Sequence, residues 1–205
     1  MNYIQRKNIK LALIILKKTY INLNIVKSCG TCGYIICYTT SNGNNQFNIL
    51  NLDGELILNK WCDSYITNED GECIIGYKKN EDDIKRSLKI DCYKNINELF
   101  DIYTYNWGAI NKYGIFNVKP IYDRLDFGNE HTYIAYYDGK EGYIDSNTGK
   151  QITSIEFYRA KKFSNGIAEV KLLNGDTKFI KRSQPVFNDI NSPKEISQTT
   201  NLKKL

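Results

Sequence analysis

Apolar side chains near the start of the chain recur with the spacing of an α-helix. Three or four residues separate successive apolar positions in this stretch (Ile9, Leu13, Leu16, Tyr20, Leu23 and Val26), so a helix places them on one face. Residues 1–30 carry six Lys and Arg residues and no acidic one. We therefore predict a basic amphipathic helix within residues 1–28 that packs on the rest of the protein. The alternative roles of such a helix are to lie on an anionic membrane surface or in the groove of a partner.

The second half of the chain repeats a short pattern of apolar and glycine positions. The pattern begins at Trp107 and again at Glu141. The equivalent positions are Gly108 with Gly142, Ile110 with Ile144, Asn111 with Asp145, Gly114 with Gly149 and Tyr122 with Phe157. Each copy predicts a short strand, a turn that needs glycine, and a second strand that returns. Because one such hairpin cannot bury its own apolar face, neighbouring copies must stack.

A more degraded copy of the pattern lies upstream. There, Phe47 takes the place of Trp107, Leu50 and Asn51 match Ile110 and Asn111, Asp53 and Gly54 form the turn, and Asp63 matches Asp123. Between this copy and Trp107, apolar residues at helical spacing among many charges predict a helical insertion at residues 81–101.

These patterns divide the chain into five segments. The N-terminal helix at 1–28 is followed by a β segment with a degenerate repeat at 29–80 and by the helical insertion at 81–101. Two repeats and the start of a further unit occupy 102–182, and a flexible basic tail occupies 183–205. The predicted fold class is mainly β, with repeated antiparallel β-hairpin units, an N-terminal helix and a helical insertion.

The repeat resembles that of the WG-repeat family of bacterial proteins. The resemblance rests on Trp107, Gly108 and Pro120 to Asp123 in one copy, and on Gly142 to Asp145 with Phe163 to Val170 in the other. It covers residues 103–181 well and 46–79 loosely, and Phe47 and Glu141 depart from the family's tryptophan. The resemblance implies a β-rich repeat protein used for interaction and brings no catalytic residues. The structural positions of the repeat are Gly54, Gly108, Gly114, Pro120, Asp123, Gly142, Asp145, Gly149 and Gly166.

Residues that usually carry catalysis are scarce. The chain has one histidine, His131, and lacks the common phosphate-loop, nucleophile and zinc motifs. Cys29 and Cys32 form a close pair that we interpret as structural or incidental, with a redox or zinc role as the alternative. We therefore expect no catalytic residue, no metal site and no cofactor. The uncharged apolar run from Leu11 to Leu16 is too short for a secretory signal or a membrane span, so we expect a cytoplasmic protein with reduced thiols.

The aromatic residues point to binding. The formal net charge of +5 comes from the two ends of the chain, whereas the repeats are balanced in charge and rich in tyrosine. Large aromatic side chains dominate protein-binding sites. We therefore predict a non-enzymatic binding module that recognises another macromolecule, most readily a protein, through an aromatic β face formed by Trp107, Tyr122, Tyr136, Tyr137 and Tyr143. The simpler interpretation is that the tyrosines fill a β core.

Three other functions stay open. The basic ends suit nucleic acid or a ribonucleoprotein. The small size and the residue skew typical of a low-GC genome suit an anti-CRISPR-like inhibitor, encoded by a mobile element, that blocks a nucleic-acid-guided defence nuclease. A carbohydrate-active or cysteine-dependent enzyme would need a pocket in which polar groups converge. The sequence does not indicate the oligomeric state.

Overall fold

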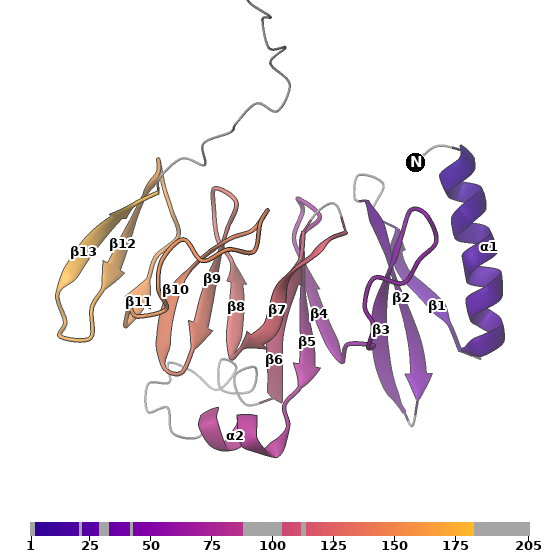
Figure 1. The fold of residues 1–205 in the computed structure, drawn as a ribbon, viewed down its shortest axis with the longest axis horizontal. Helices are drawn as coiled ribbons and strands as arrows, with labels where there is room; N and C mark the ends of the chain where they lie inside the picture. The colour runs from indigo at the N-terminus through magenta and orange to yellow at the C-terminus, as the bar shows by residue number, and fades with distance from the viewer. Residues whose placement is uncertain are drawn as a thin grey trace, which may run out of the picture.

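Four small antiparallel sheets stand side by side in a row, with one helix at the end of the row (Figure 1). The computed structural model describes residues 3–20, 22–28, 33–41, 43–87, 104–111 and 114–182. These residues form two helices and thirteen strands. The prediction of a mainly β fold with repeated hairpins, an N-terminal helix and a helical insertion is confirmed in this outline.

The strands follow one another along the chain from sheet to sheet. The first sheet contains β1 (Asn24–Ser28), β2 (Tyr34–Ser41) and β3 (Asn44–Asn51), and the second contains β4 (Ser64–Thr67), β5 (Cys73–Lys78), β6 (Tyr105–Ile110) and β7 (Phe116–Tyr122). The third contains β8 (Arg124–Phe127), β9 (Thr132–Tyr137) and β10 (Lys140–Asp145). The fourth contains β11 (Arg159–Ala160), β12 (Ile167–Lys171) and β13 (Thr177–Lys181).

Helix α1 (Tyr3–Thr19) is shorter than the sequence predicts. The apolar spacing continues to Val26, but residues 24–28 form β1, which pairs with β2. Asn22 and Asn24 are poor helix formers, and the β-branched Ile25 and Val26 suit a strand. Pairing with the edge of β2 therefore decides the conformation of this segment.

Helix α2 (Glu81–Ser87) opens the predicted helical insertion between β5 and β6. Its Asp83 accepts a hydrogen bond from the side-chain amide of Asn106 in β6 at 2.7 Å, which holds the helix against the second sheet. The remainder of the predicted insertion, the predicted tail at 183–205, and the Cys29 and Cys32 pair lie outside the described residues.

The sequence repeat coincides with the strand register. Phe47, Trp107 and Glu141 pair in the same way with the neighbouring strand, opposite Tyr38, Gly76 and Tyr136 respectively. After the turn, the chain returns and pairs with these same three residues through Cys62, Tyr122 and Phe157. Each of the first three sheets is therefore built on one common unit, and β12 and β13 form a further hairpin in the fourth.

The second position of the repeat is where the returning segment crosses closest to the strand. A Cβ on Gly108 would overlap the carbonyl oxygen of Val118, and Gly142 is similarly crowded by the segment that follows β10. The first sheet has Asn48 at this place. Its side-chain amide donates to the carbonyl oxygen of Leu58 and accepts from the Leu58 N–H. In the upstream copy, a side chain therefore spans the gap to the returning segment, where the other copies have a glycine and a close approach of the two backbones.

The turn glycines of the repeat adopt the backbone conformation that the pattern predicts. Gly54, Gly114, Gly149 and Gly166 have φ angles of 91°, 78°, 71° and 74°. In the first two of these turns the glycine N–H donates to the carbonyl oxygen of an asparagine three residues earlier: Asn51 at the end of β3 and Asn111 just after β6. A positive φ strains residues that carry a Cβ, so these positions favour glycine.

The core lies between the sheets. Neighbouring residues of one strand face opposite sides: Ile75 packs in the cluster between the first and second sheets, and Ile74 packs in the cluster between the second and third. Likewise, Tyr133 and Ile134 of β9 face the second and the fourth sheets respectively. Central strands are thus buried on both faces, as stacked hairpins require.

Candidate functional site

Four of the five aromatic residues predicted to contact a partner lie in the core. Trp107, Tyr122, Tyr136 and Tyr143 are buried, whereas Tyr137 is 38% exposed. Trp107 lies against Gly76, on which a Cβ would be 3.0 Å from the indole ring. The prediction of an exposed aromatic face is therefore wrong for these four residues. Because neighbouring sheets cover both faces of the strands, aromatic side chains that point to either side become core.

The tryptophan position of the third sheet holds a buried glutamate. Glu141 Oε1 lies 3.1 Å from Arg159 Nη1 and 3.6 Å from Arg124 Nη2, and Oε2 accepts a hydrogen bond from the Ala160 N–H at 2.6 Å. The Arg124 guanidinium also lies over the Tyr136 ring, 5.6 Å from its centre. At equivalent positions of the repeat, the second sheet thus has a packing contact between Trp107 and Gly76, and the third sheet has an ion pair made by Glu141. This carboxylate holds the fourth sheet in place.

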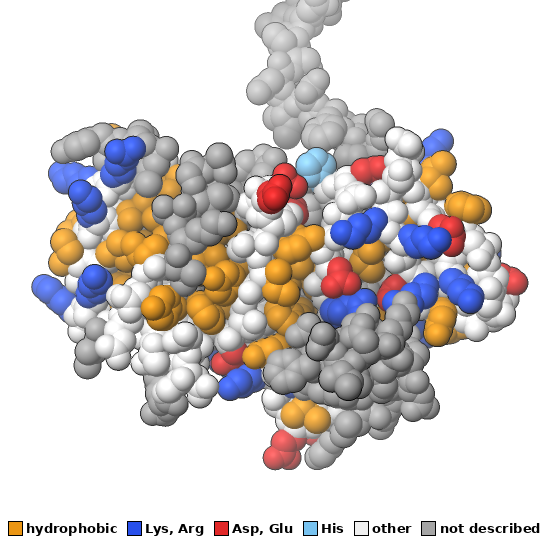
Figure 2. Space-filling view, turned by 180° about the vertical axis from the view of Figure 1, so that it is seen from behind, with side chains coloured by type: hydrophobic (Ala, Val, Ile, Leu, Met, Phe, Trp, Pro, Cys, Tyr) orange, Lys and Arg blue, Asp and Glu red, His pale blue; other side chains and the backbone are white. Residues whose placement is uncertain are grey.

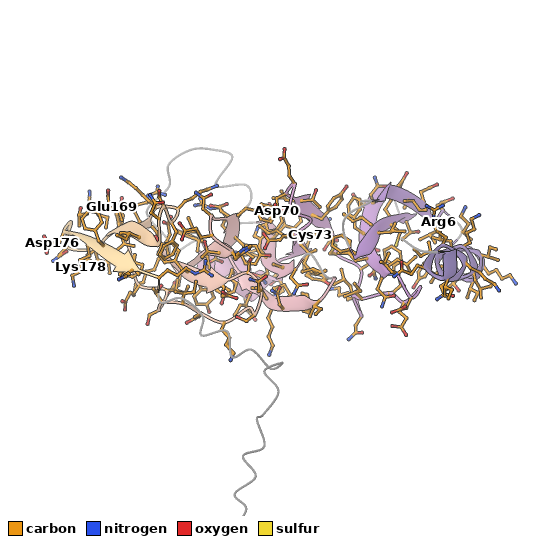
Figure 3. The ribbon with its side chains drawn as sticks, turned by 90° about the horizontal axis from the view of Figure 1, so that it is seen from above. Arg6, Asp70, Cys73, Glu169, Asp176 and Lys178 are labelled. Carbon is orange, nitrogen blue, oxygen red and sulfur yellow. The ribbon has the colours of Figure 1, made fainter. Side chains whose placement is uncertain are left out.

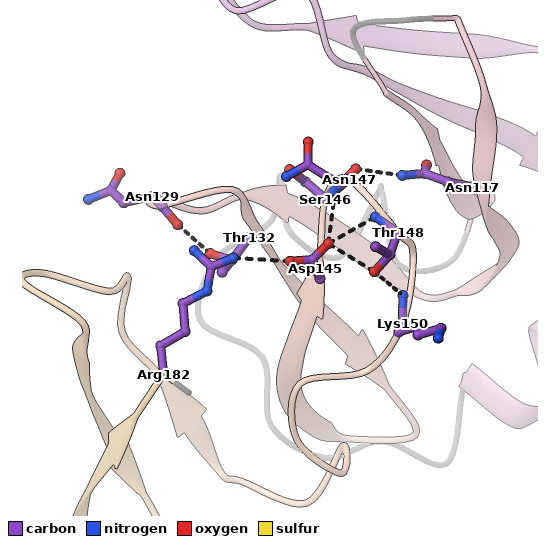
Figure 4. Close-up of polar contacts among 9 residues, drawn as sticks. All are labelled: Asn117, Asn129, Thr132, Asp145, Ser146, Asn147, Thr148, Lys150 and Arg182. Atoms are coloured by element: carbon purple, nitrogen blue, oxygen red, sulfur yellow. Dashed lines mark hydrogen bonds and ion pairs between the residues drawn. The ribbon is translucent and has the colours of Figure 1, made fainter. Parts of the chain in front are cut away.

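A polar network surrounds the turn after β10 (Figure 4). Asp145 Oδ1 accepts hydrogen bonds from the N–H groups of Asn147 and Thr148 and from the Thr148 hydroxyl, while Oδ2 pairs with Arg182 Nη2 at 3.0 Å. Asn117 of the second sheet donates to the carbonyl oxygen of Ser146. Asp145, named above as a structural position of the repeat, therefore closes the turn that follows it. Within the described ranges, no three His, Cys, Asp or Glu side chains gather to hold a metal ion.

The described cysteines and the histidine have structural surroundings. Cys37, Cys62 and Cys73 are buried, and burial raises the pKa of Cys37 to about 11 and that of Cys62 to about 12. Burial also raises the pKa of Cys73. These thiols stay protonated at neutral pH, whereas a nucleophilic cysteine needs a thiolate. His131 lies exposed in the turn before β9.

An apolar groove lies between the first and second sheets. Its volume is about 320 Å³, and it is lined by Ile57, Leu58, Asn59, Lys60, Tyr77, Phe116 and Pro120. The first four residues come from the segment between β3 and β4, Tyr77 comes from β5, and Phe116 and Pro120 come from β7. Ile115 and Ile121, which adjoin Phe116 and Pro120 along the chain, are exposed. Hydrophobic side chains gather on the half of the molecule nearer to α1, whereas charged side chains are more frequent over the other half (Figure 2).

The polar groups of the groove are held in place by one another. The Tyr77 hydroxyl donates a hydrogen bond to the carbonyl oxygen of Lys60 at 2.9 Å, and the Lys60 ammonium lies 5.7 Å from the centre of the Tyr77 ring. Burial raises the pKa of Tyr77, so its hydroxyl stays neutral. The groove thus combines apolar walls with one cation, a pattern that suits an apolar group beside a negative charge.

Sequence reasoning missed the groove, although one signal was visible. The segment from Ile115 to Tyr122 has apolar residues at both odd and even positions, and Pro120 interrupts it. A strand with apolar residues at both parities and a proline is typical of a sheet edge that presents one side to solvent or to a partner. Residues 57–60, which close the groove from the first sheet, carry no such signal.

The comparisons with known proteins leave the family open. No protein-family model and no curated protein matches the chain. One solved structure is similar in part: the crystal structure of the computationally designed Ika4 protein, at 10% sequence identity. The match covers 78% of this chain and 89% of that chain, with a TM-score of 0.33.

Proposed function

We propose that this chain is a non-enzymatic β-repeat binding module, similar to the WG-repeat proteins that its sequence resembles. We place its binding site for another protein at the groove between the first and second sheets. The observation that carries this proposal is the apolar groove itself, which the sheets form only when they stack. Its volume is at the lower end of the range typical of ligand pockets, of roughly 300–1,000 Å³. It therefore suits one or two side chains of a partner.

The chemistry of the lining indicates the kind of segment that fits. Leu58 and Pro120 offer apolar contacts, and the partly exposed Phe116 ring offers a large rigid surface of the kind that dominates binding energy. Lys60 is the charged residue among those that line the groove. We expect the partner to insert an aliphatic or aromatic side chain that is flanked by an acidic residue.

Side-chain insertion is favoured over strand addition at β7. Pro120 has no N–H, so it cannot donate the backbone hydrogen bond that an added strand would need at that position. The neighbouring Val118 and Tyr122 side chains are already committed to the core between the second and third sheets. Specificity would therefore come from the groove rather than from the strand edge.

The test is a pair of matched double variants. K60E together with F116S reverses the charge and removes the ring at the groove, whereas K178E together with F179S makes the same two changes at exposed residues of β13. A partner is first captured from the native host with the wild-type chain. It is then purified, and its dissociation constant is measured by calorimetry for all three forms.

The proposal expects the groove variant to weaken binding by about thirtyfold, the effect of losing a hot spot worth about 2 kcal/mol. The β13 variant should bind like the wild type. Equal affinity of all three forms for the purified partner would refute the groove as the site. Retention of RNA in place of a protein would refute the protein-binding proposal as a whole.

A further inference from the structure

Helix α1 has two apolar faces, and the sheets cover only one of them. Ile9 is buried against Ile35 and Leu50, with Leu13 and Leu16 partly buried beside it. A second set of large aliphatic residues is more than half exposed: Ile4, Leu11, Ile14 and Ile15. At about 100° per residue, positions 4, 11 and 15 fall within roughly 40° of one another on the side of the helix away from the core.

All the charges on α1 are positive, and their side chains are exposed. They belong to Arg6, Lys7, Lys10, Lys17 and Lys18, and the helix contains no acidic residue. Lys7 and Lys18 lie within the exposed apolar face, and the other three lie along one side of it. The helix therefore presents an exposed aliphatic face that contains two lysines and has three further cations along one side.

The position of α1 leaves this face open. The helix stands at the end of the row of sheets, and its axis runs across the long axis of the molecule (Figure 1). Seen from above, α1 lies end-on at the extremity of the row, with Arg6 on one flank of the helix, while Cys73 and Lys178 lie further along the row (Figure 3). A flat surface can approach the helix from outside without meeting the described strands.

We propose that the outward face of α1 docks on the surface of an anionic lipid bilayer, with the helix lying in the plane of the interface. Its four exposed aliphatic residues would enter the boundary between headgroups and acyl chains, and the five cations would contact anionic headgroups. This site is separate from the groove and does not depend on the proposed partner. Among the described helices, none is long and apolar enough to cross a membrane.

Lysine-rich composition favours lipid over a protein as the occupant of this face. The cores of protein interfaces are depleted of lysine, because its flexible, strongly hydrated ammonium is costly to immobilise. At a bilayer, the lysine stem covers apolar surface while the ammonium stays among the headgroups. The exposed aliphatic residues of α1 also suit the fluid acyl chains of a bilayer, which can surround them without a pocket of matching shape.

The test measures partitioning of the full chain onto vesicles. Wild-type protein is sedimented with vesicles of phosphatidylcholine mixed with phosphatidylglycerol, and with vesicles of phosphatidylcholine alone. The triple variant L11Q, I14Q and I15Q removes three of the four exposed aliphatic residues of α1 and replaces them with a good helix former. A matched control, I66Q, I167Q and L173Q, removes three exposed aliphatic residues from the sheets and their loops. Circular dichroism and thermal unfolding verify that each variant is folded.

We expect the wild type and the matched control to bind the anionic vesicles, and added salt to release them. The partition coefficient should fall about tenfold for each aliphatic residue removed from α1. The charge variant K10Q, K17Q and K18Q should lose about fivefold for each cation. Failure of the wild type to bind anionic vesicles, or equal binding by the folded L11Q, I14Q and I15Q variant, would overturn the proposal. It would equally be overturned if the wild type, without binding vesicles, formed a dimer that this variant abolishes.

Discussion

The ion pair between Lys79 and Asp123 offers a sharp test of how the second and third sheets are held together. Lys79 follows β5 and Asp123 follows β7, and Lys79 Nζ lies 2.6 Å from Asp123 Oδ1 with both side chains fully buried. Asp123 Oδ2 also accepts a hydrogen bond from the Asp138 N–H at 2.9 Å. The backbone N–H of Asp123 donates to the carbonyl oxygen of Tyr136 in β9. The pair therefore links the end of β5 to the hairpin of the third sheet.

Replacing one partner of the pair should lower the free energy of unfolding far more than replacing both partners with neutral residues. K79M keeps much of the apolar stem but leaves the Asp123 carboxylate buried without this cation, and D123N leaves the ammonium buried without its anion. Each change should lower the free energy of unfolding by about 3–5 kcal/mol, because the charge that remains buried loses the opposite charge that offsets its lost hydration. The double variant should recover most of this loss, since it removes both charges. The coupling free energy should therefore be several kcal/mol.

Urea unfolding followed by tryptophan fluorescence measures these free energies, and Trp107 reports on the second sheet directly. The matched control is the exposed pair of Lys161 and Glu169, which lie 2.8 Å apart. K161M or E169Q should change the free energy of unfolding by no more than about 1 kcal/mol. If K79M and D123N cost as little as these control changes, or if the double variant is simply additive, then the buried pair does not hold the two sheets.

Three further outcomes follow from the backbone and the thiols. G149A should lower the free energy of unfolding by about 2–3 kcal/mol in a urea titration, because the added Cβ would overlap the Asn117 carbonyl oxygen at a positive φ. Gly175 also has a positive φ but is surrounded by open space, so G175A should lower the free energy of unfolding by only about 1 kcal/mol. His131 has a φ of 56° in the turn before β9, a conformation that glycine adopts with less strain. H131G should therefore raise the free energy of unfolding, measured by the same urea titration, by about 0.5 kcal/mol. A clear decrease would contradict this. Burial raises the pKa of Cys37 to about 11 and that of Cys62 to about 12, so the thiols of the unfolded chain ionise first, near their ordinary pKa of 9.0. Stability should be intact below about pH 9 and should fall as the pH rises from there towards 11; urea titrations at neutral pH and at about pH 10 measure this, and a flat profile would contradict it.

The repeat was visible in the sequence because its signals are local. Gly114 and Gly149 are needed at positive φ, and Gly108 and Gly142 are needed where two backbones cross. Such requirements constrain residue type at fixed spacing whatever the rest of the chain does. The offset between Trp107 and Glu141 therefore corresponds to equal places in successive sheets.

The candidate site was not visible, because it depends on contacts between distant segments. Leu58, Tyr77 and Phe116 come from three separate parts of the chain and meet only when the first two sheets stack. Conversely, Trp107 and Tyr143 have the residue types of binding hot spots, and the neighbouring sheets bury them. Composition indicates how much aromatic surface there is, but packing decides which part of it stays exposed.

The amino-acid sequence alone determined the hairpin unit, its turns, its repetition and the basic helix at the start, since these follow from periodicity and from residues with special backbone needs. Tertiary structure decided where α1 ends, because an edge of β2 was available for residues 24–28 to pair with. It also decided which faces remain open: the groove beside Phe116 and the outward side of α1 are surfaces that no described sheet covers. Exposure is a property of the whole packed chain, and no local pattern of residues can specify it.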